Sequence, residues 1–433
     1  MKLTSYWYDT APPSGDYRRT EVPETVDVAI VGGGLTGLSA ALELTRHGAT
    51  VAVLESETMG WGASGRNGGM ATTGLAIGIG TAIARYGRER AIEMHLEYDR
   101  AINTIESLVD ELGIECHFER HGKLALAVTR RDLAGLRTAQ AEINSIPELP
   151  DVTVLDRSEL GKEIGSPYYV GGMVDPRGAG LHVGKFVHGL AGAAARRGAE
   201  LCEDAAVQSI SRRGARHTLQ TTRGTVDAGE VLIATSGYTG GTTPWLRRRV
   251  LPVGSFIVVT EPLSPELAGS LLPNGRMASD SKMLTYYFRL TPDNRLLFGG
   301  RARFALSNPD SDLRSAKILQ RAMSTVFPQL ASARIDYTWG GLVDITVDQM
   351  VHTGVRDGMH YSLGYSGHGV QMAAHSGREV GRYLAGKSDA YPWNDLTFPA
   401  VPGHFGPPWF LPFVGAGAHV IDGWNKLTGG RAR

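Results

Sequence analysis

Three glycines near the start of the chain have the spacing of a phosphate-binding turn. Gly32, Gly34 and Gly37 match G-x-G-x-x-G, and Glu55 follows 18 residues after the last glycine. Glycine lets the backbone approach a pyrophosphate, and a carboxylate at this spacing can accept hydrogen bonds from the hydroxyls of an adenosine ribose. The same carboxylate disfavours a 2′-phosphate. The motif therefore predicts a dinucleotide cofactor other than an NADP-type one.

Two further glycine-rich segments could enclose the same cofactor. Residues 60–69 read GWGASGRNGG and follow the acidic residue directly, and residues 364–369 read GYSGHG before an expected helix. The first segment is long enough to form a wall along an extended cofactor. The second would point a helix N-terminus at a flavin ring, where its partial positive charge favours the anionic reduced form. Because a nicotinamide enzyme needs no such third element, the two segments favour FAD over NAD.

The hydrophobic pattern around the first motif predicts a Rossmann-like unit. An apolar run at 27–31, a helical pattern at 38–47 and a second apolar run at 50–54 follow one another closely. A strand, helix and strand in this order require a parallel sheet. Further helices are expected over 82–112, 130–146, 183–197, 313–327 and 370–384, and strands near 152–155, 171–174, 201–210, 231–237 and 334–339.

Between residues 250 and 303 the pattern changes to an alternation of period two. The runs 285–290 and 295–300 flank a Pro-Asp-Asn turn, which predicts an antiparallel hairpin. We therefore expect an α/β fold, with a Rossmann-like FAD-binding domain and an α+β substrate part built on an antiparallel sheet. The expected bounds are 24–85, 150–240 and 335–390 for the FAD-binding domain, 86–149 and 241–334 for the substrate-binding domain, and 391–433 for a C-terminal tail.

The composition argues against several other classes of protein. Lys plus Arg and Asp plus Glu both number 44, so no basic excess favours nucleic acid. The only cysteines, Cys116 and Cys202, form no CxxC or CxxH spacing, so neither a disulfide framework nor a metal site is predicted, and a reducing cytoplasm is the expected location. The start has no secretory signal pattern, and no stretch reaches the roughly 18 apolar residues of a membrane span.

Several of these segments together resemble the D-amino-acid oxidase superfamily of FAD-dependent amine oxidoreductases. Residues 62–69 and 364–370 are the most specific, and residues 28–37 with Glu55, and residues 286–301, add to them. The aromatic Tyr6-Trp-Tyr8 is also similar. Within the superfamily the chain is most similar to the γ-glutamylputrescine oxidase branch, from about residue 5 to about residue 384. The resemblance implies a discontinuous FAD domain with an antiparallel substrate domain lying over the flavin.

The resemblance also implies a reaction. Hydride passes from the carbon next to an amine to N5 of FAD, the imine is hydrolysed to an aldehyde or keto product, and the flavin is reoxidised, with dioxygen as the expected acceptor and peroxide as product. Some relatives bind FAD covalently, through a cysteine in the segment matching 339–344 or a histidine near 60–69, and neither is present here. Noncovalent FAD is expected. Because the amine must be neutral to release hydride, the pocket should be apolar.

Aromatic residues and one arginine are the main candidates for a substrate pocket. Since alternate residues of a strand face the same way, Tyr287 is grouped with Arg289 and separated from Tyr286. Arg289 is expected either to bind a substrate carboxylate or to pair with a structural one. His368 could polarise the flavin C2 carbonyl or assist oxygen reduction, or it could simply pack. The predicted catalytic residues are His368, Tyr287 and Arg289, and the predicted substrate-binding residues are Trp61, Tyr286, Tyr287, Arg289, Asp344 and His352.

The cofactor is expected to contact all three glycine-rich segments and the ends of two strands. The predicted set is Gly32, Gly34, Leu35, Thr36, Gly37, Glu55, Ser56, Gly62, Ala63, Ser64, Arg66, Asn67, Gly68, Gly69, Val207, Thr235, Ser236, Gly237, Gly340, Gly367, His368, Gly369, Val370 and Gln371.

Two alternatives stay open from the sequence. A flavoprotein dehydrogenase subunit would pass electrons to a partner rather than to oxygen. An NAD-dependent dehydrogenase is disfavoured because no second Rossmann half with an acid/base histidine is visible. A γ-glutamylated diamine, an N-methyl amino acid, a simple amino acid and a secondary amine all suit such a pocket, and the sequence allows a homo-oligomer.

Overall fold

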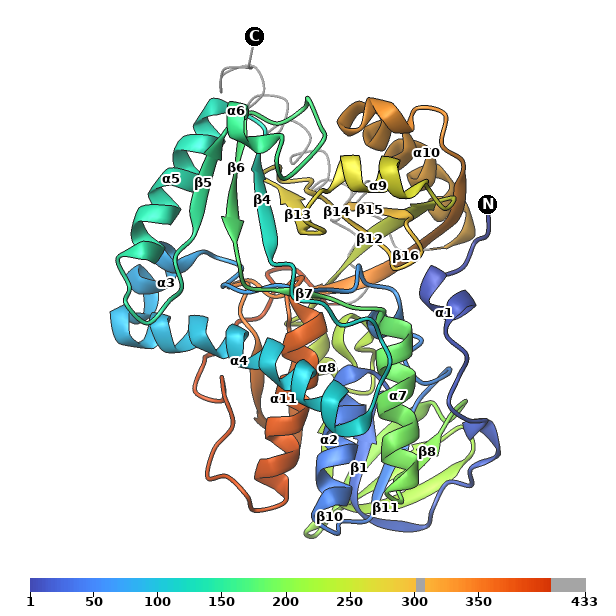
Figure 1. Ribbon diagram of the computed structural model, residues 1–433. Helices are drawn as coiled ribbons and strands as arrows, with labels where there is room; N and C mark the ends of the chain where they lie inside the picture. The colour runs from blue at the N-terminus through green and yellow to red at the C-terminus, as the bar shows by residue number, and fades with distance from the viewer. Residues whose placement is uncertain (301–307, 406–433) are drawn as a thin grey trace.

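The computed structural model describes residues 1–300 and 308–405, which form two parts that meet across the middle of the molecule (Figure 1). Each part is built on an eight-stranded sheet. The lower part in Figure 1 contains the first strand and the last helix, and the upper part contains most of the middle of the chain. The expected α/β fold with a second, antiparallel sheet is confirmed.

The first sheet is the parallel, Rossmann-like sheet. Its order is β17-β18-β11-β1-β2-β8, with the β9–β10 hairpin attached to β11. From β18 to β8 the neighbouring strands run parallel. The strands are β1 (Thr25–Val31), β2 (Val51–Leu54), β8 (Glu200–Cys202), β9 (Val207–Arg213), β10 (Arg216–Thr221), β11 (Gly224–Ile233), β17 (His352–Arg356) and β18 (Met359–Leu363).

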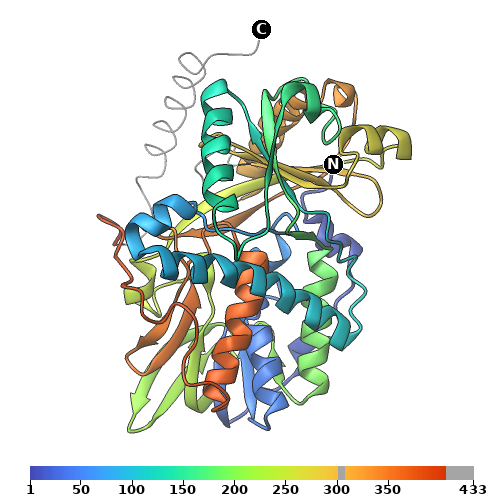
Figure 2. The same cartoon turned by 60° about the vertical axis from the view of Figure 1, so that its left-hand side comes forward.

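Three helices pack side by side against the first sheet. Helix α2 (Leu35–Arg46) contacts both α7 (Val183–Arg196) and α11 (Gly369–Leu384), and α4 (Arg88–Leu112) crosses outside them (Figures 1 and 2). The contact between α2 and α11 is close, because a methyl group at Gly377 would overlap the Thr36 carbonyl. This packing brings the N-termini of α2 and α11 to the same edge of the sheet.

The second sheet has the order β16-β12-β15-β14-β13-β4-β6-β5 and is antiparallel except between β13 and β4. The β14–β15 hairpin confirms the predicted one, and Asn294 in its turn adopts φ +58°. Helix α10 (Pro309–Val326) covers β12 and β16. The strands are β4 (Lys123–Ala127), β5 (Thr153–Asp156), β6 (Gly171–Asp175), β12 (Leu251–Thr260), β13 (Met277–Asp280), β14 (Tyr286–Leu290), β15 (Leu296–Gly300) and β16 (Ile335–Ile345).

Sheet membership differs from the expected domain bounds. Strands β5 and β6 were expected in the FAD-binding domain, but β6 pairs with β4 and β5 pairs with β6 in the second sheet, and β16 pairs with β12 there. Conversely, α4 packs on α11 of the first part. These strands are distant in sequence from most of their partners, and no local pattern specifies such pairing.

The remaining α-helices and strands are α1 (Tyr6–Thr10), α3 (Ile79–Tyr86), α5 (Arg130–Asn144), α6 (Arg157–Leu160), α8 (Pro244–Arg247), α9 (Pro265–Leu271), β3 (Met70–Ala71) and β7 (Ala179–Gly180).

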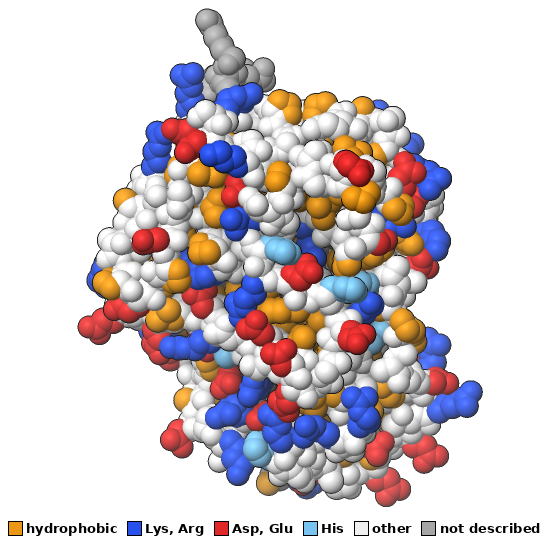
Figure 3. Space-filling model, viewed as in Figure 1, with side chains coloured by type: hydrophobic (Ala, Val, Ile, Leu, Met, Phe, Trp, Pro, Cys, Tyr) orange, Lys and Arg blue, Asp and Glu red, His pale blue; other side chains and the backbone are white. Residues whose placement is uncertain are grey.

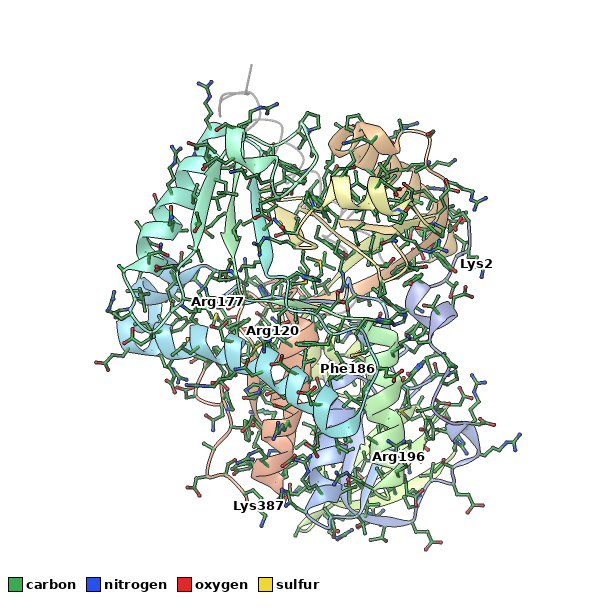
Figure 4. All side chains as sticks on the ribbon, viewed as in Figure 1. Lys2, Arg120, Arg177, Phe186, Arg196 and Lys387 are labelled. Atoms are coloured by element: carbon green, nitrogen blue, oxygen red, sulfur yellow. The ribbon has the colours of Figure 1, made fainter. Side chains whose placement is uncertain are left out.

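An arginine joins the two parts where they meet. Arg177, labelled in Figure 4, donates from Nη1 to Asp99 of α4 at 3.0 Å and from Nη2 to Asp175 of β6 at 2.9 Å. Its side chain is only 10% exposed. Buried, charge-assisted bonds of this kind hold α4 against the second sheet.

Acidic and basic side chains are intermixed over the face of the molecule drawn in Figure 3. This agrees with the equal numbers of acidic and basic residues in the sequence.

Residues 391–405 pack on the rest of the structure. Tyr391, Trp393 and Phe398 are buried, and Phe398 stacks on His352 with ring centroids 3.9 Å apart. Residues 406–433 of the expected tail lie outside the described residues. Within the described ranges, no helix is long and apolar enough to cross a bilayer, and no cluster of His, Cys, Asp and Glu could hold a metal ion.

Candidate active site

A cavity of about 700 Å³ lies between the two sheets. On one side it is lined at Val31, Leu54 and Ile233, the carboxyl ends of β1, β2 and β11. On the other side it reaches Ser255 of β12 and Tyr287 of β14. The carboxyl edge of a parallel sheet is the usual ligand-binding edge of such folds. The cavity therefore joins the predicted cofactor site to the predicted substrate sheet.

The turn after β1 forms one end of this cavity. Gly32 adopts φ +112°, and a methyl group there would lie 2.6 Å from the Ala234 carbonyl oxygen. Helix α2 follows with Gly34 as its N-cap and no side-chain capping bond. The Leu35 N–H donates to Ser64 Oγ at 2.9 Å. The other N–H groups of the first turn and its partial positive charge suit a phosphate.

Glu55 stands beside this turn at the end of β2. Its Oε2 accepts from the Gly33 N–H at 2.7 Å, and its Oε1 accepts from Ser56 Oγ and from the Glu57 N–H. Burial raises the pKa of Glu55 above its ordinary value. The carboxylate lines the cavity, so it is placed to accept ribose hydroxyls as well.

The 60–69 loop forms one wall of the cavity, and Arg66 shapes it. The guanidinium donates from Nε to the Trp61 carbonyl at 2.9 Å and from Nη1 to the Gly340 carbonyl at 3.2 Å. It also lies 4.6 Å from the centroid of the Trp61 ring. Asn67 closes the loop, since its amide nitrogen donates to the Ala63 and Ser64 carbonyls. Arg66 thus brings a positive charge to the wall while fixing the loop.

Helix α11 points its N-terminus at the same cavity. Gly367 adopts φ +97°, and the N-cap residue His368 makes no side-chain capping bond. The Nδ1 atom of His368 is buried and has no hydrogen-bond partner within the described part of the chain. Burial lowers the pKa of His368 to about 4, so its ring is neutral at physiological pH. A bound group with a hydrogen-bonding edge would satisfy this nitrogen.

The residues present fit an FAD molecule. The uncapped N-terminus of α2 suits its pyrophosphate and Glu55 suits its ribose, and the N-terminus of α11 with the unpaired His368 nitrogen suits a flavin ring. Most of the predicted cofactor residues line the cavity. The exceptions are Gly37, Gly69, Gly237, Gly340 and Gln371. Gly37 acts through packing instead, because a methyl group there would overlap the Gly32 carbonyl.

Polar and aromatic side chains also line the cavity. The Tyr287 hydroxyl lies 3.0 Å from Ser255 Oγ, and the Trp61 ring packs edge-on against Tyr238 at 5.5 Å. Asp344 Oδ2 accepts from the Gly364 N–H at 2.7 Å. Burial raises the pKa of Asp344 to about 6 despite this bond and one from Ser236. The carboxyl group can therefore change its charge close to neutral pH.

Three predicted substrate residues lie outside the cavity. Arg289 is buried and donates to the carbonyls of Gly69, Leu181 and Leu290, so it braces the end of the 60–69 loop and is placed neither to bind a substrate nor to pair with a carboxylate. Tyr286 faces the apolar core behind the second sheet. His352 is fully buried and bonds to Asp348 Oδ1 at 3.0 Å.

Sequence reasoning missed several residues that line the cavity. Ser255 and Ser279 come from β12 and β13, and Tyr238, Thr285 and Gln349 come from connecting segments. Single serines and threonines on strands carry no sequence signal for a site. Only Gln349 has an unusual backbone, with φ +60°, and that strain is invisible before the structure is known.

Fold, cavity and glycine motifs together define a flavoprotein oxidoreductase. The chain matches the family described as "FAD dependent oxidoreductase" (DAO) over residues 27–383. It is 32% identical over 394 residues to γ-glutamylputrescine oxidoreductase of Escherichia coli strain K12, covering 90% of each chain. It is 35% identical over 405 residues to the probable oxidoreductase OrdL of Rhizobium meliloti, covering 92% of each chain.

A solved structure agrees with this assignment at the level of the fold. Glycine oxidase from Geobacillus kaustophilus superposes with a TM-score of 0.74 at 22% identity, covering 88% of this chain and all of that one. The protein belongs to the DAO family and is an FAD-dependent oxidoreductase. The resemblance inferred from the glycine-rich segments is confirmed.

Proposed function

We propose that the protein oxidises an amine at the carbon next to nitrogen, to an imine that water converts to an aldehyde or keto product. The proposed substrate is a γ-glutamylated diamine or an amino-acid-like amine, and the proposed acceptor is dioxygen, with release of peroxide. The observation that carries the proposal is the single cavity from Gly32 to Tyr287. A cofactor held by α2 at one end would extend beneath the second sheet at the other.

Residues of both parts would hold the cofactor without a covalent bond. FAD, when bound, supplies a two-electron acceptor for the hydride of the amine carbon. The N-terminus of α2 and Glu55 would hold its pyrophosphate and ribose. His368 is neutral at physiological pH, so its ring can either donate or accept a hydrogen bond at the flavin edge.

The far end of the cavity would bind the amine. Asp344, with a pKa raised to about 6 by burial, is ionised at neutral pH and would attract an ammonium group inside the cavity that it lines. Tyr287 and Trp61 line the cavity and would provide aromatic surface around the reacting carbon. Removal of the amine from water in the cavity would lower its pKa and promote loss of its proton before hydride leaves, against the attraction of Asp344 for the charged form. The two cysteines are buried and unpaired, which suits the cytoplasm that we propose as the location.

Anaerobic mixing with amines tests the proposal. The purified protein would be mixed with γ-glutamylputrescine, sarcosine and amino acids while the visible flavin absorption is followed. We expect one class to bleach the flavin, and peroxide to form when air is admitted. Bleaching without peroxide would favour a dehydrogenase that passes electrons to a partner. A yellow protein that no amine bleaches would contradict amine oxidation.

A further inference from the structure

The N-terminal aromatic segment, residues 5–8, has no role in the function described so far. It precedes the residues that match the family, 27–383, and none of its four residues lines the cavity. Ser5, Tyr6 and Trp7 are nevertheless buried, with Trp7 at 0% exposure. Specific contacts must therefore hold this segment against the rest of the structure.

Three side chains of the segment bond to the 60–69 loop from its outer side. Ser5 Oγ donates to the Gly65 carbonyl at 2.7 Å, and Trp7 Nε1 donates to the Asn67 carbonyl at 2.7 Å. Tyr8 Oη donates to the Gly60 carbonyl at 2.6 Å. Carbonyl groups of a loop away from water need such donors. The inner side of the same loop lines the cofactor cavity.

The fit between segment and loop is also steric. A methyl group at Gly65 would overlap the Tyr8 phenol, so the two surfaces are in direct contact. The Arg66 guanidinium lies 5.8 Å from the centroid of the Tyr8 ring and 4.6 Å from that of the Trp61 ring. Tyr8 therefore supports an arginine that lines the cavity.

The segment is anchored to the second sheet at its other side. The Lys2 N–H donates to the Asp336 carbonyl at 2.6 Å, which places residue 2 beside β16. Figure 4 shows Lys2 at this outer edge of the upper part. Tyr6 Oη donates to Asp293 in the β14–β15 turn at 2.7 Å. The segment thus links the second sheet to the loop that belongs to the first part.

We propose that residues 5–8 lock the 60–69 loop in the conformation that encloses FAD. Ser5, Trp7 and Tyr8 are positioning residues, because they act through the loop and not on the flavin. If the segment leaves its place, three loop carbonyls lose their donors and the wall of the cavity can open. Retention of FAD is then controlled by a segment more than 50 residues before the loop.

A matched pair of variants tests the lock. Tyr8→Phe removes one hydroxyl that bonds to the loop, and Tyr6→Phe removes one hydroxyl from the same segment that bonds to the second sheet instead. FAD would be titrated into each apoprotein and the quenching of flavin fluorescence recorded. We expect the dissociation constant to rise about three- to tenfold for Tyr8→Phe, the range for one hydrogen bond, and less than about twofold for Tyr6→Phe.

Ser5→Ala provides a second, independent variant should Tyr8→Phe fail to fold, and it should also weaken FAD binding. The melting temperature of each apoprotein separates the lock from simple stabilisation. A structural role would lower the melting temperature of the variants and leave the FAD dissociation constant unchanged. Wild-type FAD affinity in both Tyr8→Phe and Ser5→Ala, or an equal loss in Tyr6→Phe, would overturn the proposal.

Discussion

The two ends of the cavity are built in different ways. At the phosphate end, one unbroken stretch from β1 to β2 supplies the glycine turn, the helix N-terminus and Glu55. At the substrate end, Ser279, Tyr287 and Asp344 come from three strands of the second sheet, and Trp61 comes from the 60–69 loop. A site made from one supersecondary unit depends on a few backbone positions. A site assembled from several segments spreads its dependence, so single changes there should cost less.

The largest effect is expected at the phosphate end, from Gly32→Ala. The new methyl group would meet the Ala234 carbonyl at 2.6 Å, at a residue with φ +112°. We expect FAD affinity to fall by more than about 100-fold, since backbone strain and a steric clash add at one position. The measurement is the ratio of flavin to protein after purification.

Gly135→Ala is the control for that variant. Gly135 lies exposed in α5 with nothing within 4 Å of an added methyl group. Its FAD content should be that of the wild type, and its free energy of unfolding should rise by roughly 0.5–1 kcal/mol. Full FAD occupancy in Gly32→Ala would show that the turn tolerates the substitution. It would contradict the expectation that single changes cost more at the phosphate end than at the substrate end.

Asp344 gives the substrate end a pH dependence. Its pKa rises from 3.8 to about 6 on burial, so the folded state holds the proton more tightly than the unfolded state does. The stability that this proton contributes is complete below about pH 4 and is lost as the pH rises through 6. Because asparagine does not titrate, Asp344→Asn should not lose stability over this pH range through this position.

Urea unfolding of both apoproteins at several pH values checks this expectation. Relative to the wild type, the free energy of unfolding of Asp344→Asn should increase by at most about 3 kcal/mol between pH 4 and pH 8. If the difference in free energy of unfolding between the two proteins stays constant from pH 4 to pH 8, Asp344 is ionised over this whole range and its pKa is ordinary.

Arg289→Lys distinguishes a loop brace from a substrate clamp. Lysine keeps the charge but cannot reach the carbonyls of Gly69, Leu181 and Leu290 together. We expect the FAD dissociation constant to rise about tenfold, through lost charge-assisted bonds, while KM for the amine stays within about twofold. A large rise in KM with unchanged FAD affinity would restore the carboxylate-binding role predicted from the sequence.

The smallest effect is expected from Tyr287→Phe. The hydroxyl lost from the cavity lies 3.0 Å from Ser255 Oγ, and its removal should lower kcat/KM about fivefold, as expected for one neutral hydrogen bond. Tyr286→Phe, one residue earlier and on the opposite face of β14, serves as the control and should change kcat/KM by less than about twofold. Equal effects of the two substitutions would mean that the cavity is not where the amine binds.

The residues that sequence reasoning located share a local cause. Gly32, Gly34 and Glu55 follow from the order strand, turn, helix and strand, and His368 follows from a glycine-rich segment before a helix. Alternation along β14 also separated Tyr287 from Tyr286 correctly. Alternation did not predict the surroundings of Arg289. This residue is on the same face of β14 as Tyr287, two residues later, but its guanidinium bonds to the carbonyls of Gly69 and Leu181. Which backbone lies over a strand is not a local property.

The sequence by itself determined the parallel sheet, the cofactor turn, the β14–β15 hairpin and the class of enzyme. The first three depend on the backbone preferences of glycine and on hydrophobic periodicity, both of which act within about 30 residues. The class of enzyme followed from the resemblance of several segments to a known family. Only the tertiary structure decided that β5, β6 and β16 join the second sheet, that Arg289 braces a loop, and that residues 5–8 bond to residues 60–69. Most of those contacts join segments far apart in the chain, so they depend on how distant segments pack and not on any local pattern.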